Sequence, residues 1–281
     1  RQDRAALSFQ VALVPGAMDA QGRTRGEAQQ IYAVGAAMDA FIAQAARRFK
    51  QPLRIDALPK SSSYRQVLAE ERELSLAPGR FLTELQASTV KIWERNGSAE
   101  HADWLRVTLA AASGNRLRTL RLEAKKDGVH GLVAGGTGSG KSELLMTMIV
   151  GLALNYSPDI LNFVLVDYKG GGAFKPFEGL PHCVDIVTNL NVAAVERMFT
   201  AINAEIRRRQ ALNAETGTKD IVEYREKGLH KSREPYPHLF VIIDEYAEMI
   251  DSNDAYLREI ESITRVGRAQ GVNLLLSLIH I

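Results

Sequence analysis

The sequence has few of the features that mark secreted, membrane-spanning or unfolded proteins. Cys183 is the single cysteine among 281 residues, which excludes an internal disulfide framework and favours a reducing, cytosolic setting. No apolar run approaches the roughly 18 to 20 residues that a membrane span needs. The charges nearly cancel, with 35 Lys and Arg against 33 Asp and Glu. This balance gives no support to a surface that strongly neutralises nucleic acid, although it leaves room for a local basic loop.

The composition that is present indicates a folded domain. Hydrophobic residues make up 46% of the chain and the formal net charge is only +2, so we expect a sizeable core and exclude disorder as the main state. The length suits one large domain, or one domain with an appendage. The chain starts at Arg1 without a methionine and stops at Ile281 within a predicted strand, so we expect it to be a fragment of a longer protein.

The first 123 residues carry weak functional signals. Between 28 and 49, apolar residues recur three or four positions apart, which predicts an amphipathic helix. Residues 59–63 (Pro-Lys-Ser-Ser-Ser) indicate a linker or turn, and the alternation across 104–124, around Ser-Gly-Asn, predicts a β-hairpin. We therefore expect a helical approach segment over 1–75, a linker or the tail of a preceding module, and an N-terminal extension with the β-hairpin over 76–123.

From residue 124 the pattern changes to an alternation of strands and helices. Strands are predicted at 131–134, 161–167, 184–187, 239–243 and 272–276, and helices at 142–156, 192–206 and 256–269. The run 161–167 is almost continuously apolar, as in a strand buried on both faces. We predict an α/β fold with a mostly parallel sheet and helices on both faces, over a core of residues 124–276, and leave 277–281 unassigned.

A glycine-rich stretch joins the first of these strands to the first of these helices and matches the phosphate-binding pattern G-x-x-x-x-G-K-[ST] in full. Its members are Gly135, Gly136, Thr137, Gly138, Ser139, Gly140, Lys141 and Ser142. The glycines let backbone N–H groups turn towards phosphate oxygens at the positive end of the following helix. Lys141 can reach the β- and γ-phosphates and the Ser142 hydroxyl can ligate Mg²⁺, so we interpret the stretch as an ATP site rather than a flexible linker.

An acidic pair, Asp244 and Glu245, follows the apolar run 239–243. An aspartate at the carboxyl end of a buried strand can hold the Mg²⁺ through water, and the adjacent glutamate can polarise the attacking water as a general base. The alternative is a strand-to-helix junction whose acid caps the helix. Because the strand 161–167 lies between the two motifs in sequence, we expect a RecA-like strand order. The paired acid favours hydrolysis over nucleotide holding alone.

These motifs, with others along the chain, resemble those of the FtsK/SpoIIIE family of ring-forming ATPases. The resemblance covers about residues 100–276. It is carried by 130–143 (His-Gly-Leu-Val-Ala-Gly to Lys-Ser-Glu), 166–174 (Val-Asp-Tyr-Lys-Gly-Gly-Gly-Ala-Phe), Leu-Pro-His at 180–182, Thr-Asn-Leu at 188–190, Arg-Arg at 208–209, Asp-Glu-Tyr at 244–246 and Arg-Val-Gly-Arg-Ala-Gln-Gly at 265–271. Within the family, the first two stretches are most similar to the EccC/EssC branch, the motor ATPases of type VII secretion. The DNA pumps form the sister branch.

The resemblance implies a RecA-like P-loop core with Walker A and Walker B motifs that take ATP and Mg²⁺. It adds Glu143 to the nucleotide-binding residues, and it leaves Ser142 and Asp244 as the metal-binding ones. It also implies a ring oligomer, as a hexamer, in which one subunit supplies an arginine to the site of the next. Our candidates for this arginine are Arg208 and Arg209, with Arg265 and Arg268 as rivals; side chains that merely solvate a helix face are the alternative.

Three further features of the sequence carry weaker signals. Lys169 lies at a strand end, where it faces the nucleotide or a central pore, or is a solvated residue of a glycine-rich turn. His182 and Cys183 lie between apolar residues and are interpreted as packed core. Residues 9–12 weakly resemble the strand that closes a preceding module of the same kind, which indicates ATPase modules in tandem.

The resemblance leaves three functions open. The first is a motor module of a type VII-like secretion system, which couples ATP hydrolysis to movement of helical-hairpin protein substrates, with membrane secretion subunits as partners. This soluble fragment would then work at the cytoplasmic face of the bacterial cell membrane, anchored through spans N-terminal to it. The second is a double-stranded DNA translocase. The third is a regulatory nucleotide-binding module without turnover, favoured because the family's small-residue-Thr-Gln sensor does not follow Leu276 and opposed by the intact Walker residues.

Overall fold

The computed structural model describes residues 63–98, 105–112, 116–136, 138–168, 170, 172–188 and 192–278. All of them lie within the compact unit Pro59–Ile281. The helix expected over 28–49 and the strand-like residues 9–12 are outside the described ranges. Within those ranges, no helix combines the length and the apolar character that crossing a bilayer requires.

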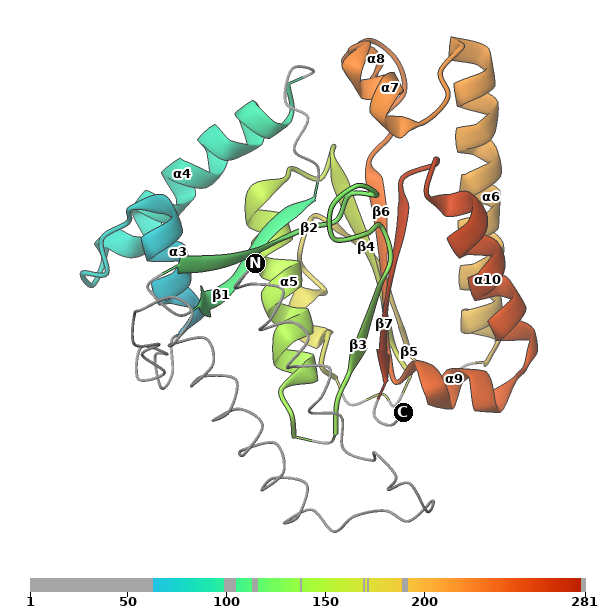
Figure 1. Ribbon diagram of the computed structural model, residues 1–281, viewed down its shortest axis with the longest axis horizontal. Helices are drawn as coiled ribbons and strands as arrows, with labels where there is room; N and C mark the ends of the chain where they lie inside the picture. Colours follow the sequence, from blue (N-terminus) through green and yellow to red (C-terminus); the bar gives the residue numbers. More distant parts are fainter. Residues whose placement is uncertain are drawn as a thin grey trace, which may run out of the picture. The chain divides into compact units, whose positions relative to one another are not determined.

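Five parallel strands form the central sheet, in the order β3-β7-β6-β4-β5 (Figure 1). Their bounds are β3 Gly131–Ala134, β4 Leu161–Asp167, β5 Cys183–Thr188, β6 His238–Asp244 and β7 Val272–Leu278. The parallel α/β fold is therefore confirmed. β7 separates the P-loop strand β3 from the acid-bearing strand β6, as in the RecA-like order that the sequence predicts.

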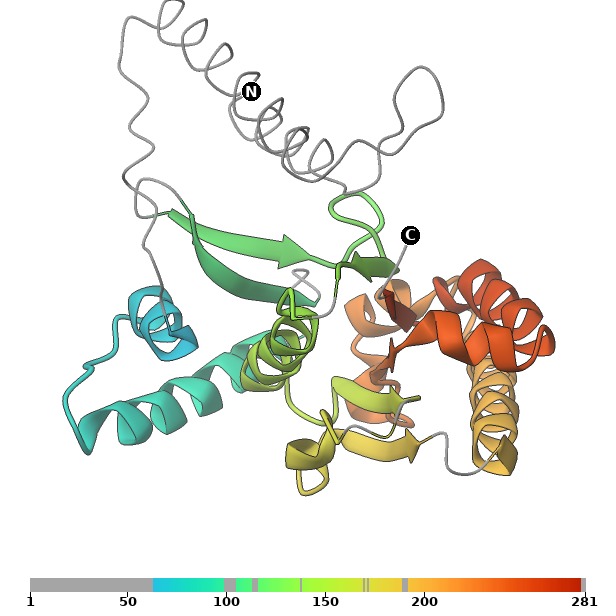
Figure 2. The same ribbon diagram turned by 90° about the horizontal axis from the view of Figure 1, so that it is seen from below.

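Helices cover both faces of this sheet, as predicted. On one face, α5 (Lys141–Asn155) packs its buried residues Leu145, Ile149 and Leu152 against Phe163 and Phe240. On the other face lie α6 (Val192–Thr216), α9 (Tyr246–Ser252) and α10 (Ala255–Gly267). Figures 1 and 2 show α5 on one side of the strands and α6 with α10 on the other. Strands that are covered on both faces have almost continuously apolar sequences, because the side chains on both faces are buried.

The N-terminal extension packs against α5. It consists of α3 (Tyr64–Arg72), α4 (Arg80–Asn96) and an antiparallel hairpin of β1 (Arg106–Ala112) and β2 (Arg116–Arg121). The predicted hairpin is confirmed. Ser63, which belongs to the predicted linker or turn, caps α3: its hydroxyl accepts a hydrogen bond from the Gln66 N–H, and the Gln66 side chain accepts one from the Ser63 N–H. Helix α4 is not among the predicted elements.

Short elements complete the unit: the 3₁₀ turn η2 Lys175–Phe177 and the helices α7 Ile221–Glu226 and α8 Leu229–Ser232. β7 continues two residues beyond the strand end expected at Leu276. Ser277 and Leu278 pair with Val133 and Ala134 at the end of β3. The last described residues therefore support the strand that leads into the P-loop.

Candidate nucleotide site

The P-loop and the acidic pair lie at the same edge of the sheet. The glycine-rich loop follows the carboxyl end of β3 and leads into α5, whereas Asp244 is the last residue of β6. Parallel strands end at a common edge, which is at the bottom of Figure 1, where β3 passes into α5. Crevices at the carboxyl ends of such strands are the usual ligand sites of open α/β sheets.

The loop has the backbone geometry that a phosphate requires. Gly138 and Gly140 adopt positive φ angles of 74° and 89°, a region that side chains disfavour. A Cβ at Gly135 would lie 2.5 Å from the Ser139 Oγ, so the loop folds closely on itself at this point. Gly140 is the N-cap of α5, and no side chain caps this end of the helix. The first N–H groups of α5 are thus left for a ligand, and they favour an anion. Thr137 is outside the described ranges.

Lys141 lies across this loop. Its Nζ donates hydrogen bonds to the carbonyl oxygens of Gly135 at 2.8 Å and Gly136 at 3.1 Å. A phosphate bound in the loop would offer the ammonium a charged acceptor in place of these neutral carbonyls. Ser142 is half-buried beside it, and Glu143 is exposed in the first helical turn. The P-loop residues therefore fit a nucleotide phosphate.

The two acids differ in exposure and in backbone geometry. Asp244 is buried, and its Oδ1 accepts a hydrogen bond from the Glu245 N–H at 3.1 Å. Glu245 is half-buried and has a φ of 59°, one of three positive values among the described non-glycine residues. A non-glycine residue costs about 1 kcal/mol or more in this region, and such outliers cluster at functional sites. The sharp turn at Glu245 separates Asp244, which ends β6, from α9, which starts at Tyr246.

A third carboxylate lies next to this pair. Asp167, the last residue of β4, is the register partner of Asp244, so both side chains are on the same face of the sheet. Its Oδ2 accepts a hydrogen bond from the Ala173 N–H at 3.1 Å, which folds the glycine-rich segment after β4 back towards the strand end. Asp167 belongs to the stretch 166–174 that carries the family resemblance, but no role in the site is predicted for it, although it ends an apolar run as Asp244 does. Lys169, in the same segment, is outside the described ranges.

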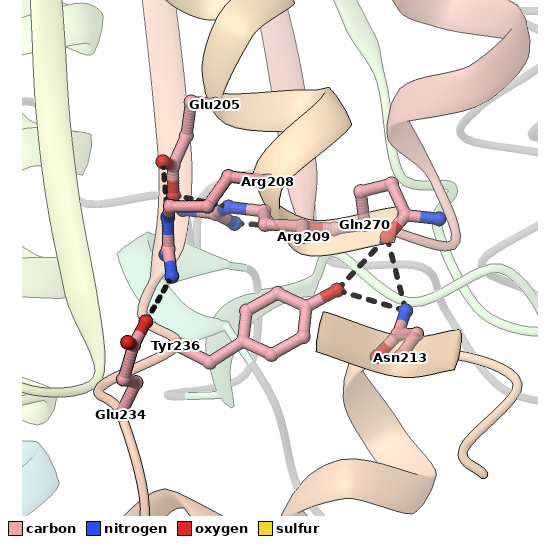
Figure 3. A network of polar contacts seen from close by, with 7 residues as sticks. All are labelled: Glu205, Arg208, Arg209, Asn213, Glu234, Tyr236 and Gln270. Atoms are coloured by element: carbon pink, nitrogen blue, oxygen red, sulfur yellow. Dashed lines mark hydrogen bonds and ion pairs between the residues drawn. The ribbon is translucent and has the colours of Figure 1, made fainter. Parts of the chain in front are cut away.

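The two central arginine candidates have different environments, although they are adjacent (Figure 3). Arg209 is 1% exposed; its Nε donates to Glu205 and its Nη1 to the Gln270 carbonyl, both at 2.7 Å. Its guanidinium also lies over the Tyr236 ring. Arg208 is partly exposed and forms ion pairs with Glu205 and with Glu234, both at 2.8 Å.

The carboxylate between these arginines is stabilised in its charged form. Burial by itself raises the pKa of Glu205, but hydrogen bonds from Arg208 and Arg209 outweigh it and lower the pKa below its ordinary value. The Arg209 guanidinium is thus fully engaged in contacts within its own chain. We read Arg209 as a structural residue of α6.

All four candidate arginines lie towards the sheet edge opposite the P-loop. Arg208 contacts Glu234, which precedes β6, and Arg209 contacts Gln270, which precedes β7. The rivals Arg265 and Arg268 are exposed at the end of α10, which also leads into β7. None of the four is therefore placed beside the P-loop of its own chain, and the assignment of an arginine that acts on a neighbouring subunit stays a prediction.

His182 is part of the packed core, as predicted. It is 1% exposed, its ring meets Trp93 edge-on, and its Nε2 lies 2.7 Å from the Tyr156 carbonyl oxygen. Burial lowers its pKa, so the ring is neutral near pH 7 and the proton on Nε2 is donated to that carbonyl. Cys183 is only partly buried.

A parallel α/β sheet with a P-loop at the carboxyl end of an edge strand, and an acidic strand end nearby, defines the class of P-loop NTPases. The FtsK/SpoIIIE family model matches residues 95–281, and the chain belongs to this family.

The relatives it resembles are secretion proteins. The chain is 39% identical over 195 residues to the Type VII secretion system protein EssC of Staphylococcus aureus (strain NCTC 8325 / PS 47). It is 39% identical over 197 residues to the ESX secretion system protein EccC of Geobacillus thermodenitrificans (strain NG80-2). Each alignment covers 68% of this chain but 13% of the relative, so the chain spans a small part of their length.

The structure is similar to that of a related ATPase. The cytoplasmic domain of the Thermomonospora curvata Type VII Secretion ATPase EccC matches with a TM-score of 0.59 and 38% sequence identity, over 64% of this chain and 22% of that one. The chain therefore shares the fold of a domain of that protein.

Proposed function

We propose that this chain binds Mg²⁺-ATP at the carboxyl edge of its sheet and hydrolyses it. One observation carries the proposal: the P-loop, with the uncapped start of α5, and the acidic pair Asp244 and Glu245 occupy the same edge. A phosphate held by the loop would thus lie near an acid that can hold the metal and an acid that can act on water.

Each residue has a role that follows from its position. The N–H groups of residues 135–140 and of the first turn of α5, with Glu143 in that turn, form the phosphate-binding end of the site. Lys141 exchanges its loop carbonyls for the β- and γ-phosphate oxygens, and Glu245 orients the attacking water and accepts its proton. Ser142 and Asp244 would hold Mg²⁺, the former directly and the latter through water. The metal, when bound, neutralises charge on the phosphates.

We further propose that hydrolysis drives a type VII-like secretion motor. The identity to EssC and EccC proteins supports this, since it extends over two thirds of the chain. In this proposal the module forms a ring, as a hexamer, at the cytoplasmic face of the bacterial cell membrane. Secretion subunits anchored in the membrane would be its partners, and proteins with a helical hairpin its substrates. A neighbouring subunit would complete each site with an arginine, for which Arg208 is the more accessible of the two central candidates.

Steady-state ATP hydrolysis tests the proposal, with Glu245→Gln as the blank, with and without Mg²⁺. The assay is repeated with duplex DNA at two salt concentrations. Turnover above the blank that ignores DNA is the expected result. Stimulation by DNA that weakens with salt, as counterion release requires, would reassign the chain to the double-stranded DNA translocases. ADP binding without turnover would reassign it to the regulatory modules.

A further inference from the structure

The last four carbonyl groups of α5, the helix that begins at the P-loop, all accept hydrogen bonds from side chains. Helix ends leave four carbonyls without partners inside the helix, and these usually bond to water or to a local turn. The C-cap Tyr156 donates its N–H to the Leu152 carbonyl, so the carbonyls that lie beyond the last bond of the helix are those of residues 153–156. Their donors are Trp93 Nε1 to Ala153 (3.0 Å), Arg72 Nη2 to Leu154 (3.1 Å), Asn96 Nδ2 to Asn155 (2.7 Å) and His182 Nε2 to Tyr156 (2.7 Å).

Three of these four donors come from the N-terminal extension. Arg72 ends α3, and Trp93 and Asn96 lie in the last turn of α4. Asn96 is 5% exposed, so water does not replace the contact if this side chain is lost. The Arg72 guanidinium places a positive charge at the negative end of the α5 dipole. Its other Nη is held by the hydroxyls of Ser88 and Thr89 on α4.

The extension also holds α5 along its side. The Asn155 side chain donates to the Arg106 carbonyl of β1 at 2.9 Å and accepts from Arg72 at 2.9 Å. Further up the helix, Tyr64 packs against Gly151, where a Cβ would collide with its hydroxyl. Movement of α5 along its axis, or rotation about it, would break several of these contacts at once.

We propose that Arg72, Trp93 and Asn96 are positioning residues: through them the N-terminal extension fixes the position of α5, and with it the nucleotide-binding end of that helix. Nucleotide binding in turn shifts the extension. This inference rests on the proposed function. A helix of 15 residues is about 22 Å long and stiff along its axis. Lys141 and the phosphate-binding N–H groups are at one end of it and the three donors are at the other. Coupling between the two ends is reciprocal by thermodynamic necessity.

Trp93 provides a direct readout of this coupling. The chain has two tryptophans, so Trp104→Phe leaves Trp93 as the single emitter. MgADP is titrated into this variant, and binding is measured in parallel by calorimetry. We expect Trp93 emission to change as MgADP is added, and the Kd fitted to this change to equal the calorimetric Kd. The nucleotide lies about 22 Å away and cannot touch the indole. In a Lys141→Ala background the change should disappear.

A matched pair of arginine variants gives the reverse measurement. Arg72 and Arg65 both lie on α3 and both donate to a backbone carbonyl, but Arg65 bonds Leu76 and stacks on Phe81 within the extension. We expect Arg72→Ala to raise the Kd for MgADP about threefold to tenfold, with Arg72→Lys in between and Arg65→Ala within about twofold of wild type. Thermal melts identify any variant that is unfolded.

The outcomes separate this inference from the proposed function. Two results would overturn the positioning role and leave the ATP site intact, provided that calorimetry shows binding to the wild type. The first is no change in Trp93 emission. The second is equal Kd values for Arg72→Ala and Arg65→Ala when both are folded. The absence of calorimetric binding to wild type would overturn both. The emission test needs no substitution at Arg72, so it holds even if Arg72→Ala does not fold.

Discussion

The hydroxyl of Tyr64 lies over the α-carbon of Gly151, in the middle of the P-loop helix, and donates a hydrogen bond to the Thr108 carbonyl at 2.9 Å. A Val107 methyl group approaches the same α-carbon from β1. Glycine weakens a helix interior by about 1 kcal/mol relative to alanine. At this position it is needed because any side chain would separate the extension from α5.

Gly151→Ala should therefore destabilise the protein by about 1–3 kcal/mol, despite the better helix propensity of alanine, because overpacking outweighs it. Urea unfolding gives the value. Removing the colliding hydroxyl with Tyr64→Phe should recover part of the loss in the double variant. Gly179→Ala, at an exposed turn with open space around it, should have little effect. A Gly151→Ala protein as stable as wild type would contradict the close approach.

Arg209→Ala and Arg208→Ala should differ sharply in stability. Loss of the buried Arg209 removes its bonds to Glu205 and to the Gln270 carbonyl, and we expect a cost of about 2–4 kcal/mol. The partly exposed ion pairs of Arg208 are worth less than about 1 kcal/mol. Urea midpoints at pH 7.5 measure both changes. Similar losses for the two variants would argue against this division of roles.

Glu245→Gln should lower kcat for ATP by about 10² or more while the protein still binds nucleotide, because a neutral amide cannot accept the proton of the attacking water. Lys141→Ala should instead weaken nucleotide binding itself. Turnover assays together with calorimetric titration of MgADP separate the two effects. A Glu245→Gln variant with wild-type kcat would remove this residue from the catalytic step.

Acid should destabilise the protein through its buried histidines. Burial, with the positive charges of Arg225 and Arg209 nearby, lowers the pKa of His238 to about 3. The unfolded chain binds a proton below about pH 6.5, whereas the folded chain does not until about pH 3, so stability is full above 6.5 and is lost as the pH falls. Burial lowers the pKa of three other histidines in the same direction: His130, His182 and His230.

The lowered pKa of His238 alone should decrease the free energy of unfolding by about 2 kcal/mol between pH 7 and pH 5. Urea unfolding at pH 7.5, 6.5, 5.5 and 5.0 measures the slope, in a range above the ordinary titration of carboxylates. His238→Gln should flatten the curve. A free energy of unfolding that is constant over this range would show that the histidines take up protons equally in both states.

Much of the core could be predicted from local patterns. The run Leu161–Asp167 coincides with β4 because burial on both faces makes the strand an almost continuous apolar run, which is recognised in the sequence. The P-loop was predictable from its glycine spacing between a strand and a helix. The different burial of Arg208 and Arg209 also left a signal, since Arg209 continues the buried stripe of Ile202 and Ile206 whereas Arg208 lies beside it.

The contacts made by the extension could not be predicted in this way. The spacing of Phe81, Leu85 and Ile92, with Gly97 after them, does indicate the helix α4. Nothing local shows that Trp93 bonds to a carbonyl 60 residues away. A backbone carbonyl accepts a hydrogen bond whatever its side chain is, so the sequence gives no sign of it. Side-chain donors to such carbonyls can be identified only from the packed structure.

The place of β3 in the sheet has a consequence for how the chain is made. Among the described residues its sheet partner is β7, and the two strands are joined across 144 positions, as in the bond from Asn273 to the Val129 carbonyl. At about 5 to 20 residues per second, a ribosome needs roughly 7 to 30 s to add them. Until then the strand that precedes the P-loop has no neighbour to fix it. A nascent chain therefore completes its nucleotide site only after β7 has been made, when the other described strands of the sheet are already present.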